Sequence, residues 1–150
     1  FRAVYAEAFK ALNQHWISQY WDLETSDIKA LNDPQGHIID RGGYIAIAKH
    51  QDTVIGCCAL IPIDQECVEL AKMAVSDEAK GKGVGFLLGT HIIQQAKAMG
   101  ARRVYLESNT RLEPAINLYK KLGFKRVVGQ SSPYSRCNIQ MELCLSLDNI

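Results

Sequence analysis

The spacing of hydrophobic residues changes along the chain from a helical period to a strand period. The segment YAEAFKALNQHWISQYWDLETSDIKALN (5–32) repeats apolar residues every three to four positions, which predicts one or two helices. The residues available for their packed face are Ala8, Leu12, Ile17, Tyr20 and Leu23. We interpret the preceding FRAV (1–4) as the end of a strand.

Three strands are expected in the middle of the chain. DPQG (33–36) has the composition of a turn, and RGG (41–43) is a second break. Beyond these breaks, strand-like patterns cover 44–50, 54–63 and 67–75. Their polar connections are short, and short connections join antiparallel neighbours, so we expect a meander.

Helices and strands alternate in the remainder of the chain. Apolar residues recur at helical spacing over 86–100, and Pro114 opens a second helix that Gly123 ends. Further strands are expected over 102–108, 125–129 and 138–145. No linker, repeat or low-complexity segment interrupts this order. The pattern therefore predicts an α+β (mixed α/β) fold in a single domain over 1–150.

Composition excludes several function classes without identifying one. The chain has 17 basic and 16 acidic residues and a net charge of +1, so no long-range field favours nucleic acid. Its five cysteines lack C-x-x-C spacing, which argues against a disulfide framework or a zinc site and favours a reducing, cytoplasmic environment. No apolar run reaches the ~20 residues that cross a bilayer, so we expect no membrane partner.

Three glycines at alternate positions mark the start of the helix after the third strand. Gly81, Gly83 and Gly85 leave backbone N–H groups accessible to an anion, and Lys80 or Lys82 adds positive charge. A flexible turn is the alternative interpretation. The spacing fits neither a Walker loop, because Phe86 follows Gly85, nor a dinucleotide fingerprint.

Two segments together resemble one enzyme family. ELAKMAVSDEAKGKGVGFLLG (69–89) is similar to the signature segment of the GNAT acetyltransferases, [Q/R]-x-x-G-x-[G/A] between a strand and a helix. LESNTRLEPAINLYKKLGFKRV (106–127) resembles the second segment of that family. Lys80 stands where the family usually has Gln or Arg. The resemblance is to the small bacterial-type members and covers most of the chain.

The resemblance implies a mostly antiparallel sheet of about six or seven strands, flanked by about four helices. Its two middle strands, 67–75 and 103–108, would splay apart around acetyl-CoA, with no metal. The residues implied to bind this co-substrate are Met73, Ala74, Val75, Lys80, Gly81, Lys82, Gly83, Val84, Gly85, Phe86, Asn109 and Tyr119. Asn109 would tie pantetheine or the Tyr119 helix in place, and the alternative is an ordinary turn residue.

The family pattern also implies three catalytic groups. Glu69, an acid in an apolar strand, is the candidate base that accepts a proton from the amine. The alternative is that Glu69 points to solvent, with strand alternation among its neighbours deciding the face. The backbone amide of Met73 would stabilise negative charge on the thioester oxygen. Tyr119 would protonate the departing thiolate, unless it is only a core aromatic residue.

The acceptor side of the site is less specific. Arg136, with Tyr134 and Asn138 nearby in sequence, suits recognition of a carboxylate on the acceptor amine. Its alternative is a solvated charge at a sheet edge. Trp16, with Tyr20 and Trp21, lines either an acceptor pocket or the core, and Glu24 and Asp27 could instead attract a cationic amine.

The sequence thus predicts an N-acetyltransferase that uses acetyl-CoA and a primary amine, in direct attack within a ternary complex. The acceptor is expected to be a small molecule or amino-acid-like metabolite. A protein or peptide acceptor is the first alternative, and a non-catalytic acyl-CoA-binding sensor is the second. Exposed edge strands provide a route to a homodimer.

Overall fold

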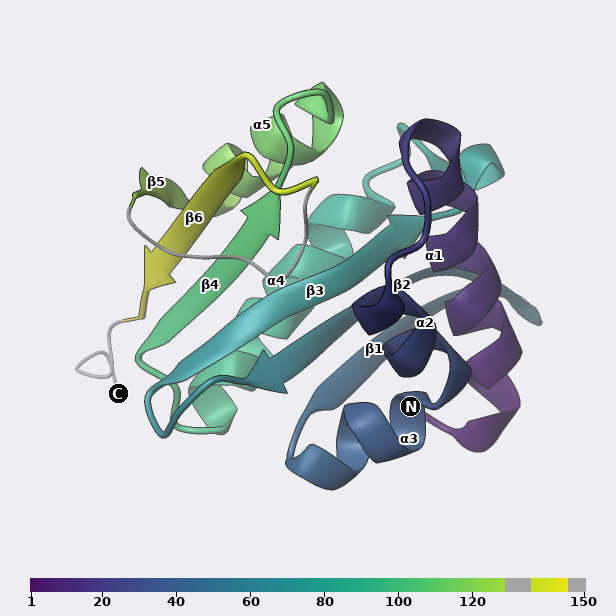
Figure 1. Ribbon diagram of the computed structural model, residues 1–150, viewed down its shortest axis with the longest axis horizontal. Coiled ribbons are helices and arrows are strands. Elements are labelled where there is room, and N and C mark those ends of the chain that lie inside the picture. Colours follow the sequence, from purple (N-terminus) through teal and green to yellow (C-terminus); the bar gives the residue numbers. More distant parts are fainter. Residues whose placement is uncertain (129–135, 146–150) are drawn as a thin grey trace.

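The computed structural model describes residues 1–128 and 136–145, which form an α+β fold around one open sheet (Figure 1). The sheet order is β1-β2-β3-β4-β6-β5. Its strands are β1 (Tyr44–His50), β2 (Thr53–Pro62), β3 (Cys67–Val75), β4 (Arg103–Ser108), β5 (Lys125–Val127) and β6 (Ile139–Cys144). Five α-helices and three short 3-10 helices accompany these six strands in the described part of the chain, so the expected fold class is confirmed.

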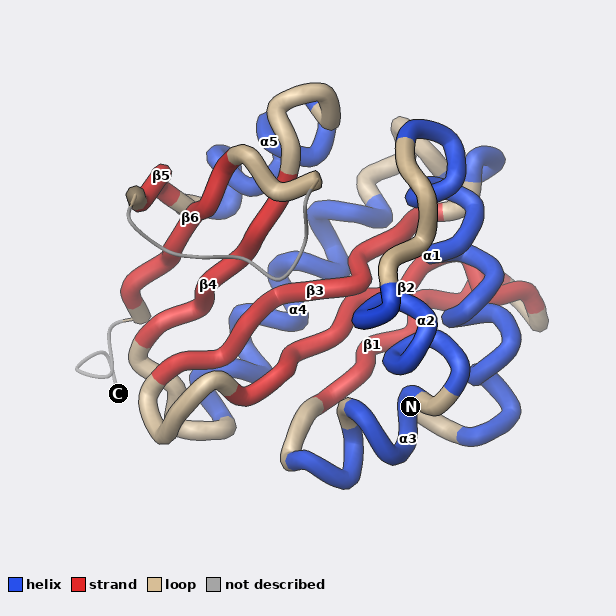
Figure 2. The backbone as a smooth tube through the Cα atoms, in the orientation of Figure 1, coloured by secondary structure: helices blue, strands red, loops and turns tan. Residues whose placement is uncertain are grey.

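Helices cover both faces of the sheet (Figure 2). On one face α4 (Val84–Ala98) and α5 (Glu113–Leu122) pack through Leu88, Ile92 and Ile116 against Val104 and Leu106 of β4. A second cluster forms where α1 (Ala6–Tyr20), α2 (Thr25–Asn32) and α3 (Pro34–His37) meet the other face. The sheet therefore separates two apolar cores.

Three expectations for the N-terminal region are wrong. The first residues are not a strand, because Ala3–Tyr5 form a 3-10 helix that leads directly into α1. The DPQG segment is not only a turn, since Asp33 accepts a hydrogen bond from the Gly36 N–H (3.0 Å) and caps α3. Tyr20 does not belong to the packed face of α1, because it is 46% exposed. The buried face consists of Phe9, Asn13 and Ile17, which follow one another at intervals of four residues.

The splay between the two middle strands is present. β1, β2 and β3 form the expected antiparallel meander. β3 and β4 pair in parallel only at Cys67↔Arg103, Val68↔Val104 and Glu69↔Tyr105. Beyond these three pairs the strands diverge, as Figure 1 shows. The inner edges of both strands are therefore left without a strand partner where the gap opens.

A β-bulge follows this last pair in β3. Cys57 is opposite Ala74 and Ala59 is opposite Ala71, so two residues of β3, Lys72 and Met73, face a single residue of β2. Lys72 has a φ of 54°, in the left-handed region that costs a non-glycine residue about 1 kcal/mol or more.

The bulge exchanges the two faces of β3. Before it, Val68 and Leu70 pack in the α4–α5 core, whereas after it Met73 packs there and Ala74 lies in the α1–α2 core. Simple alternation would put Met73 on the same face as Glu69, but the extra residue changes the parity of the strand and puts Met73 on the opposite face.

The described residues contain no helix with the length and apolar character needed to cross a membrane. None of the five cysteines, all of which lie in the described part of the chain, forms a disulfide.

Candidate functional site

The splay between β3 and β4 opens a cleft of about 700 Å³. Its walls come from the two strands, the glycine-rich loop, the end of α1 and the connection between β4 and α5. The residues singled out from the sequence that line it are Trp16, Tyr20, Trp21, Glu69, Met73, Ala74, Val75, Lys80, Gly81, Gly83, Val84, Gly85, Phe86, Asn109, Tyr119 and Arg136. Lys82 and Asn138 are not among the lining residues, and Tyr134 lies outside the described residues.

The glycine-rich loop delivers accessible N–H groups to one end of the cleft. Gly83, with a φ of 84°, is the N-cap of α4, and the first helical hydrogen bond runs from the Leu87 N–H to the Gly83 carbonyl (3.0 Å). The N–H groups of Val84, Gly85 and Phe86 precede that bond, so the helix itself provides them with no acceptor. An anion bound there would also lie at the positive end of the helix dipole.

Lys80, which stands where the resembled family usually has Gln or Arg, braces this loop through an ion pair. Its Nζ lies 2.9 Å from Asp77 Oδ1, and Asp77 Oδ2 lies 2.6 Å from His15 Nε2 on α1. The pKa of Asp77 is lowered by its hydrogen bonds to Lys80 and His15. The loop is thereby linked to the N-terminal helix.

Glu69 lies in the middle of the cleft, beside Tyr105 and on the same face as Glu107. Burial and the neighbouring charge of Glu107 raise the pKa of Glu69 to about 7, against a smaller opposing effect of Lys72. Glu107 itself accepts a hydrogen bond from the Tyr105 hydroxyl (2.7 Å). The carboxyl of Glu69 can therefore exchange a proton near neutral pH.

Tyr119 is part of the core and also part of the cleft wall, while its catalytic role stays a prediction. It is 8% exposed and packs edge-on against Phe124 with ring centroids 6.1 Å apart, and it also lines the cleft. Burial raises the pKa of Tyr119 well above its ordinary range, so the phenol keeps its proton at neutral pH. It is a core residue whose side chain borders the cleft.

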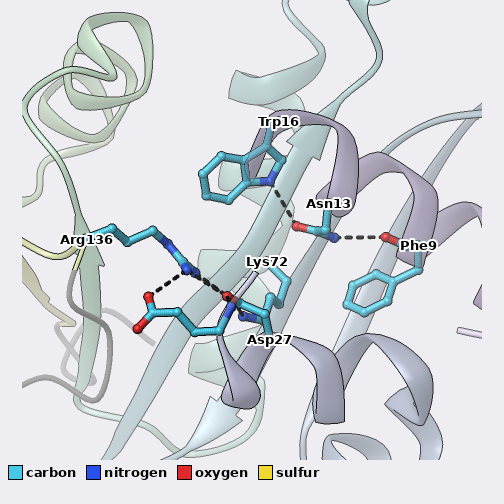
Figure 3. A network of polar contacts seen from close by, with 7 residues as sticks. Phe9, Asn13, Trp16, Asp27, Lys72 and Arg136 are labelled. Carbon is cyan, nitrogen blue, oxygen red and sulfur yellow. Dashed lines mark hydrogen bonds and ion pairs between the residues drawn. The ribbon is translucent and has the colours of Figure 1, made fainter. Parts of the chain in front are cut away.

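One fully buried carboxylate organises the opposite side of the cleft (Figure 3). Asp27 on α2 contacts the Lys72 ammonium (2.8 Å) and accepts two hydrogen bonds of 2.7 Å from the Arg136 guanidinium. Its Oδ2 also accepts the N–H of Glu24 (3.0 Å), and Glu24 binds Arg136 in turn (3.1 Å). Burial would raise the pKa of Asp27, but the hydrogen bonds from Arg136 and the charge of Lys72 bring it down to about 2.

This network changes the interpretation of Arg136. The structure directs its guanidinium toward Asp27 and Glu24, so a carboxylate on the acceptor would have to compete with these partners. Its role as a carboxylate receptor stays a prediction that the geometry does not favour. Trp16 lies beneath the same guanidinium (5.9 Å to the ring centroid), and its indole N–H donates to Asn13 (3.1 Å).

Polar residues at the end of β4 hold the connection to α5. The Asn109 side chain donates to the Arg136 carbonyl (2.7 Å) and accepts the N–H of Arg111 (2.8 Å). Asn138 is part of the same brace rather than of the cleft wall, since its Oδ1 accepts the Thr110 N–H (2.9 Å). The turn interpretation of Asn109 thus has direct support, while a contact with pantetheine stays a prediction.

Two walls of the cleft contact each other through a cation and two aromatic rings. The guanidinium carbon of Arg111, from the β4–α5 connection, lies 5.0 Å from the Tyr20 ring centroid and 5.5 Å from that of Trp21. The rings at the end of α1 therefore stack with a cation from the opposite wall.

Sequence reasoning missed two charged residues of the cleft, Lys72 and Glu107. A lysine within the apolar strand 67–75 was a usable signal, because a buried ammonium requires an acid partner. Glu107 was recognisable because it lies two residues after Tyr105 in β4, and this spacing puts both side chains on one face of the sheet. Among the described residues, no group of three or more His, Cys, Asp or Glu side chains is arranged to hold a metal ion.

Comparison with known proteins identifies the family to which this architecture corresponds. The sequence model of the acetyltransferase (GNAT) family matches residues 5–124. An uncharacterised N-acetyltransferase of Schizosaccharomyces pombe is 31% identical over 121 residues, which cover 78% of this chain and 74% of that protein. N-acetyltransferase 8B of Rattus norvegicus is 26% identical over 80% of this chain, which spans only 54% of that relative.

Solved structures show the same fold at low sequence identity. A GNAT acetyltransferase of Staphylococcus aureus superposes with a TM-score of 0.86 at 18% identity, covering 97% of this chain and 96% of that protein. A GNAT acetyltransferase of Elizabethkingia anophelis with acetyl-CoA bound gives a TM-score of 0.61 at 23% identity, covering 83% and 92% of the two chains.

The buried Asp27 network should make the stability of the protein depend on acid pH. Because the folded pKa of Asp27 lies below its ordinary value of 3.8, its stabilisation is complete above that value and is lost as the pH falls through about 2. The difference corresponds to about 2 kcal/mol of unfolding free energy. Urea unfolding at pH 6 and pH 2 should show this loss in the wild type.

Asp27→Asn should be less stable than the wild type at pH 6. Between pH 6 and pH 2 its free energy of unfolding should fall by about 2 kcal/mol less than that of the wild type. Asp33→Asn, which removes an exposed carboxylate but keeps a side-chain oxygen to cap α3, is the matched control and should retain the wild-type acid dependence. Equal pH dependence in Asp27→Asn and the wild type would contradict the ion-pair assignment.

Proposed function

Because the chain belongs to the acetyltransferase (GNAT) family, we propose that it transfers an acetyl group from acetyl-CoA to a primary amine bound in the cleft between β3 and β4. The observation that carries this proposal is the position of Glu69. It lies where the strands part, half-buried in the same cleft as the glycine-rich loop, with its pKa raised by burial to about 7.

The glycine-rich end of the cleft suits the pyrophosphate of coenzyme A. The N–H groups of Val84, Gly85 and Phe86 would hold its oxygens, with Lys80 as a nearby cation. The inner edges of β3 and β4 would pair with the amides of pantetheine, as an added strand does at a sheet edge. Acetyl-CoA supplies the thioester as an activated acyl group.

Glu69 is proposed as the general base. A primary amine is mostly protonated at neutral pH, with a pKa of ~10.4 for a lysine-like amine or ~8 for an α-amine, and it must lose a proton to become a nucleophile. A carboxyl with a pKa of about 7 is ionised often enough to accept that proton and is basic enough to retain it, directly or through a water. Glu107 would assist by holding the ammonium electrostatically.

Met73 and Tyr119 are proposed to act on the other side of the reacting carbon. Both line the cleft, Met73 immediately after the bulge. The Met73 N–H would donate to the carbonyl oxygen as negative charge develops there. The Tyr119 hydroxyl, protonated at neutral pH, would deliver its proton to the departing sulfur.

A small-molecule amine is the proposed acceptor. Trp16, Tyr20 and Trp21 line the acceptor side of the cleft, where Arg111 stacks on the last two rings. A compact amine with an apolar body would fill such a space, with its ammonium toward Glu69 and Glu107.

The proposal is tested by incubating the protein with acetyl-CoA and a panel of small primary amines. Release of the coenzyme A thiol and a mass increase of one acetyl group on an amine are the expected results. Peptides with different N-terminal residues form a second panel, and acetylation of these alone would assign a protein acceptor. Calorimetric binding of acetyl-CoA without transfer to any acceptor would favour a sensor, and absence of binding would contradict the proposal.

Substitution of Glu69 should remove one limb of the pH–rate profile. In the wild type, kcat/KM should rise with pH to a plateau with its midpoint near 7, because the carboxylate is the active form. Glu69→Gln should lower kcat by about 10²–10⁴-fold and abolish this limb.

Glu107→Gln removes a like charge and should move the same midpoint to lower pH. Glu7→Gln, an exposed carboxylate on α1 outside the cleft, is the control and should leave the profile unchanged. A Glu69→Gln enzyme with full activity and the wild-type pH profile would rule out the base.

Tyr119→Phe tests the acid. Removal of the hydroxyl leaves the packing against Phe124 in place, so stability should change little while kcat falls by about 10²-fold or more. Turnover at the wild-type rate, in a variant with an unchanged melting temperature, would show that Tyr119 is only a core residue.

A further inference from the structure

The alternative to the bulge in β3 is a regular strand without the extra residue, and the sequence must make that arrangement less favourable. In a regular strand, Lys72 would continue the alternation of Val68 and Leu70 and would point into the apolar core beneath α4 and α5. With the bulge, its side chain points to the opposite face and reaches α2. The side chain of Lys72 is 4% exposed there, so it needs a buried acid partner to be tolerated.

Asp27 provides that partner from 45 residues away in sequence. Its carboxylate is fully buried and lies 2.8 Å from the Lys72 ammonium. An apolar residue at position 27 would deprive the ammonium of this 2.8 Å ion pair, and the regular register would bury the ammonium in the apolar core. The ion pair therefore favours the bulged register over the regular one.

The same carboxylate also reaches the opposite wall of the cleft. Arg136, which binds both oxygens of Asp27, is joined through its carbonyl to the Asn109 side chain at the end of β4. Lys72 lies in β3, the first wall, and Asn109 follows β4, the second. One buried carboxylate is thus connected to both strands that diverge around the cleft, and Figure 3 shows its contacts with Lys72 and Arg136.

We propose that Asp27 is a positioning residue for acetyl transfer: by holding Lys72 and Arg136 it keeps β3 in its bulged register and fixes Met73 and Glu69 relative to the β4 wall. This rests on the proposed function, and it assigns a role to a residue that contacts no reacting atom. A misplacement of catalytic groups by about 1 Å can lower a rate by about 10²-fold.

The test compares Asp27→Asn, Lys72→Met and the double variant with the wild type. Each single variant should lower kcat by at least about tenfold while the KM for acetyl-CoA and the calorimetric Kd for coenzyme A change by less than about threefold, because the glycine-rich loop contacts neither residue. The double variant should be no slower than the slower single variant, since both act through one contact.

Hydrogen exchange provides a readout that needs no acceptor amine. The backbone amides of 70–75 should exchange faster in Asp27→Asn than in the wild type, whereas those of β1 should be unchanged. The double variant removes both charges of the Asp27–Lys72 pair, so neither is left buried without the other. It can therefore be measured even if a single variant folds poorly. Asp33→Asn is the control, and its kcat and exchange at 70–75 should equal those of the wild type.

Two results would overturn the proposal. One is unchanged exchange at 70–75 in both Asp27→Asn and the double variant; the other is a loss of kcat matched by an equal loss of folded protein. Absence of acetyl transfer by the wild type would instead contradict the proposed function, and the exchange measurement would still decide whether Asp27 holds the bulge.

Discussion

The geometry of the cleft depends on the buried pairing of Asp27 with Lys72. A lysine ammonium cannot remain charged in an apolar interior without an acid beside it, and the single extra residue in β3 is what brings Lys72 to that acid. From this constraint follow the face on which Met73 lies and the attachment of α2 to the sheet. Replacement of such a pair by apolar residues can be stabilising in proteins, so its value here lies in specifying one register rather than in adding stability.

Two carboxyl groups of the same region differ in ionisation for physical reasons. Asp27 is fully buried behind the cleft wall and Glu69 is half-buried in the cleft itself. Asp27 gains two cations and stays ionised, whereas Glu69 has the like charge of Glu107 nearby and becomes a weaker acid. Separate environments thus provide both a fixed anion for architecture and a carboxyl suited to proton transfer.

The sequence predicted the sheet more completely than the site. The meander and the start of α4 at the glycines follow from local pattern and turn chemistry, whereas the parting of β3 from β4 was implied only by the resemblance to the GNAT family. The bulge was not predictable in this way, because lysine carries no preference for a positive φ and simple alternation puts Met73 on the wrong face.

Contacts between distant segments account for the rest of what was not predicted. Arg136 lies 109 residues from Asp27, and nothing near either residue in sequence indicates that they meet. A single arginine beside a strand is compatible with recognition of a substrate carboxylate and with an internal ion pair. Only the three-dimensional arrangement separates these roles, and it directs the guanidinium to the carboxylates of α2.

The separation of β3 from β4 also bears on how the protein avoids self-association. Beyond the pair Glu69↔Tyr105, β3 and β4 each present a row of backbone N–H and C=O groups to the gap. Such rows are templates for pairing with a neighbouring molecule. Here both rows face the cleft, across which Arg111 stacks with Tyr20 and Trp21. The fold thereby places two unpaired stretches of sheet edge inside a binding site rather than along an outer edge of the sheet.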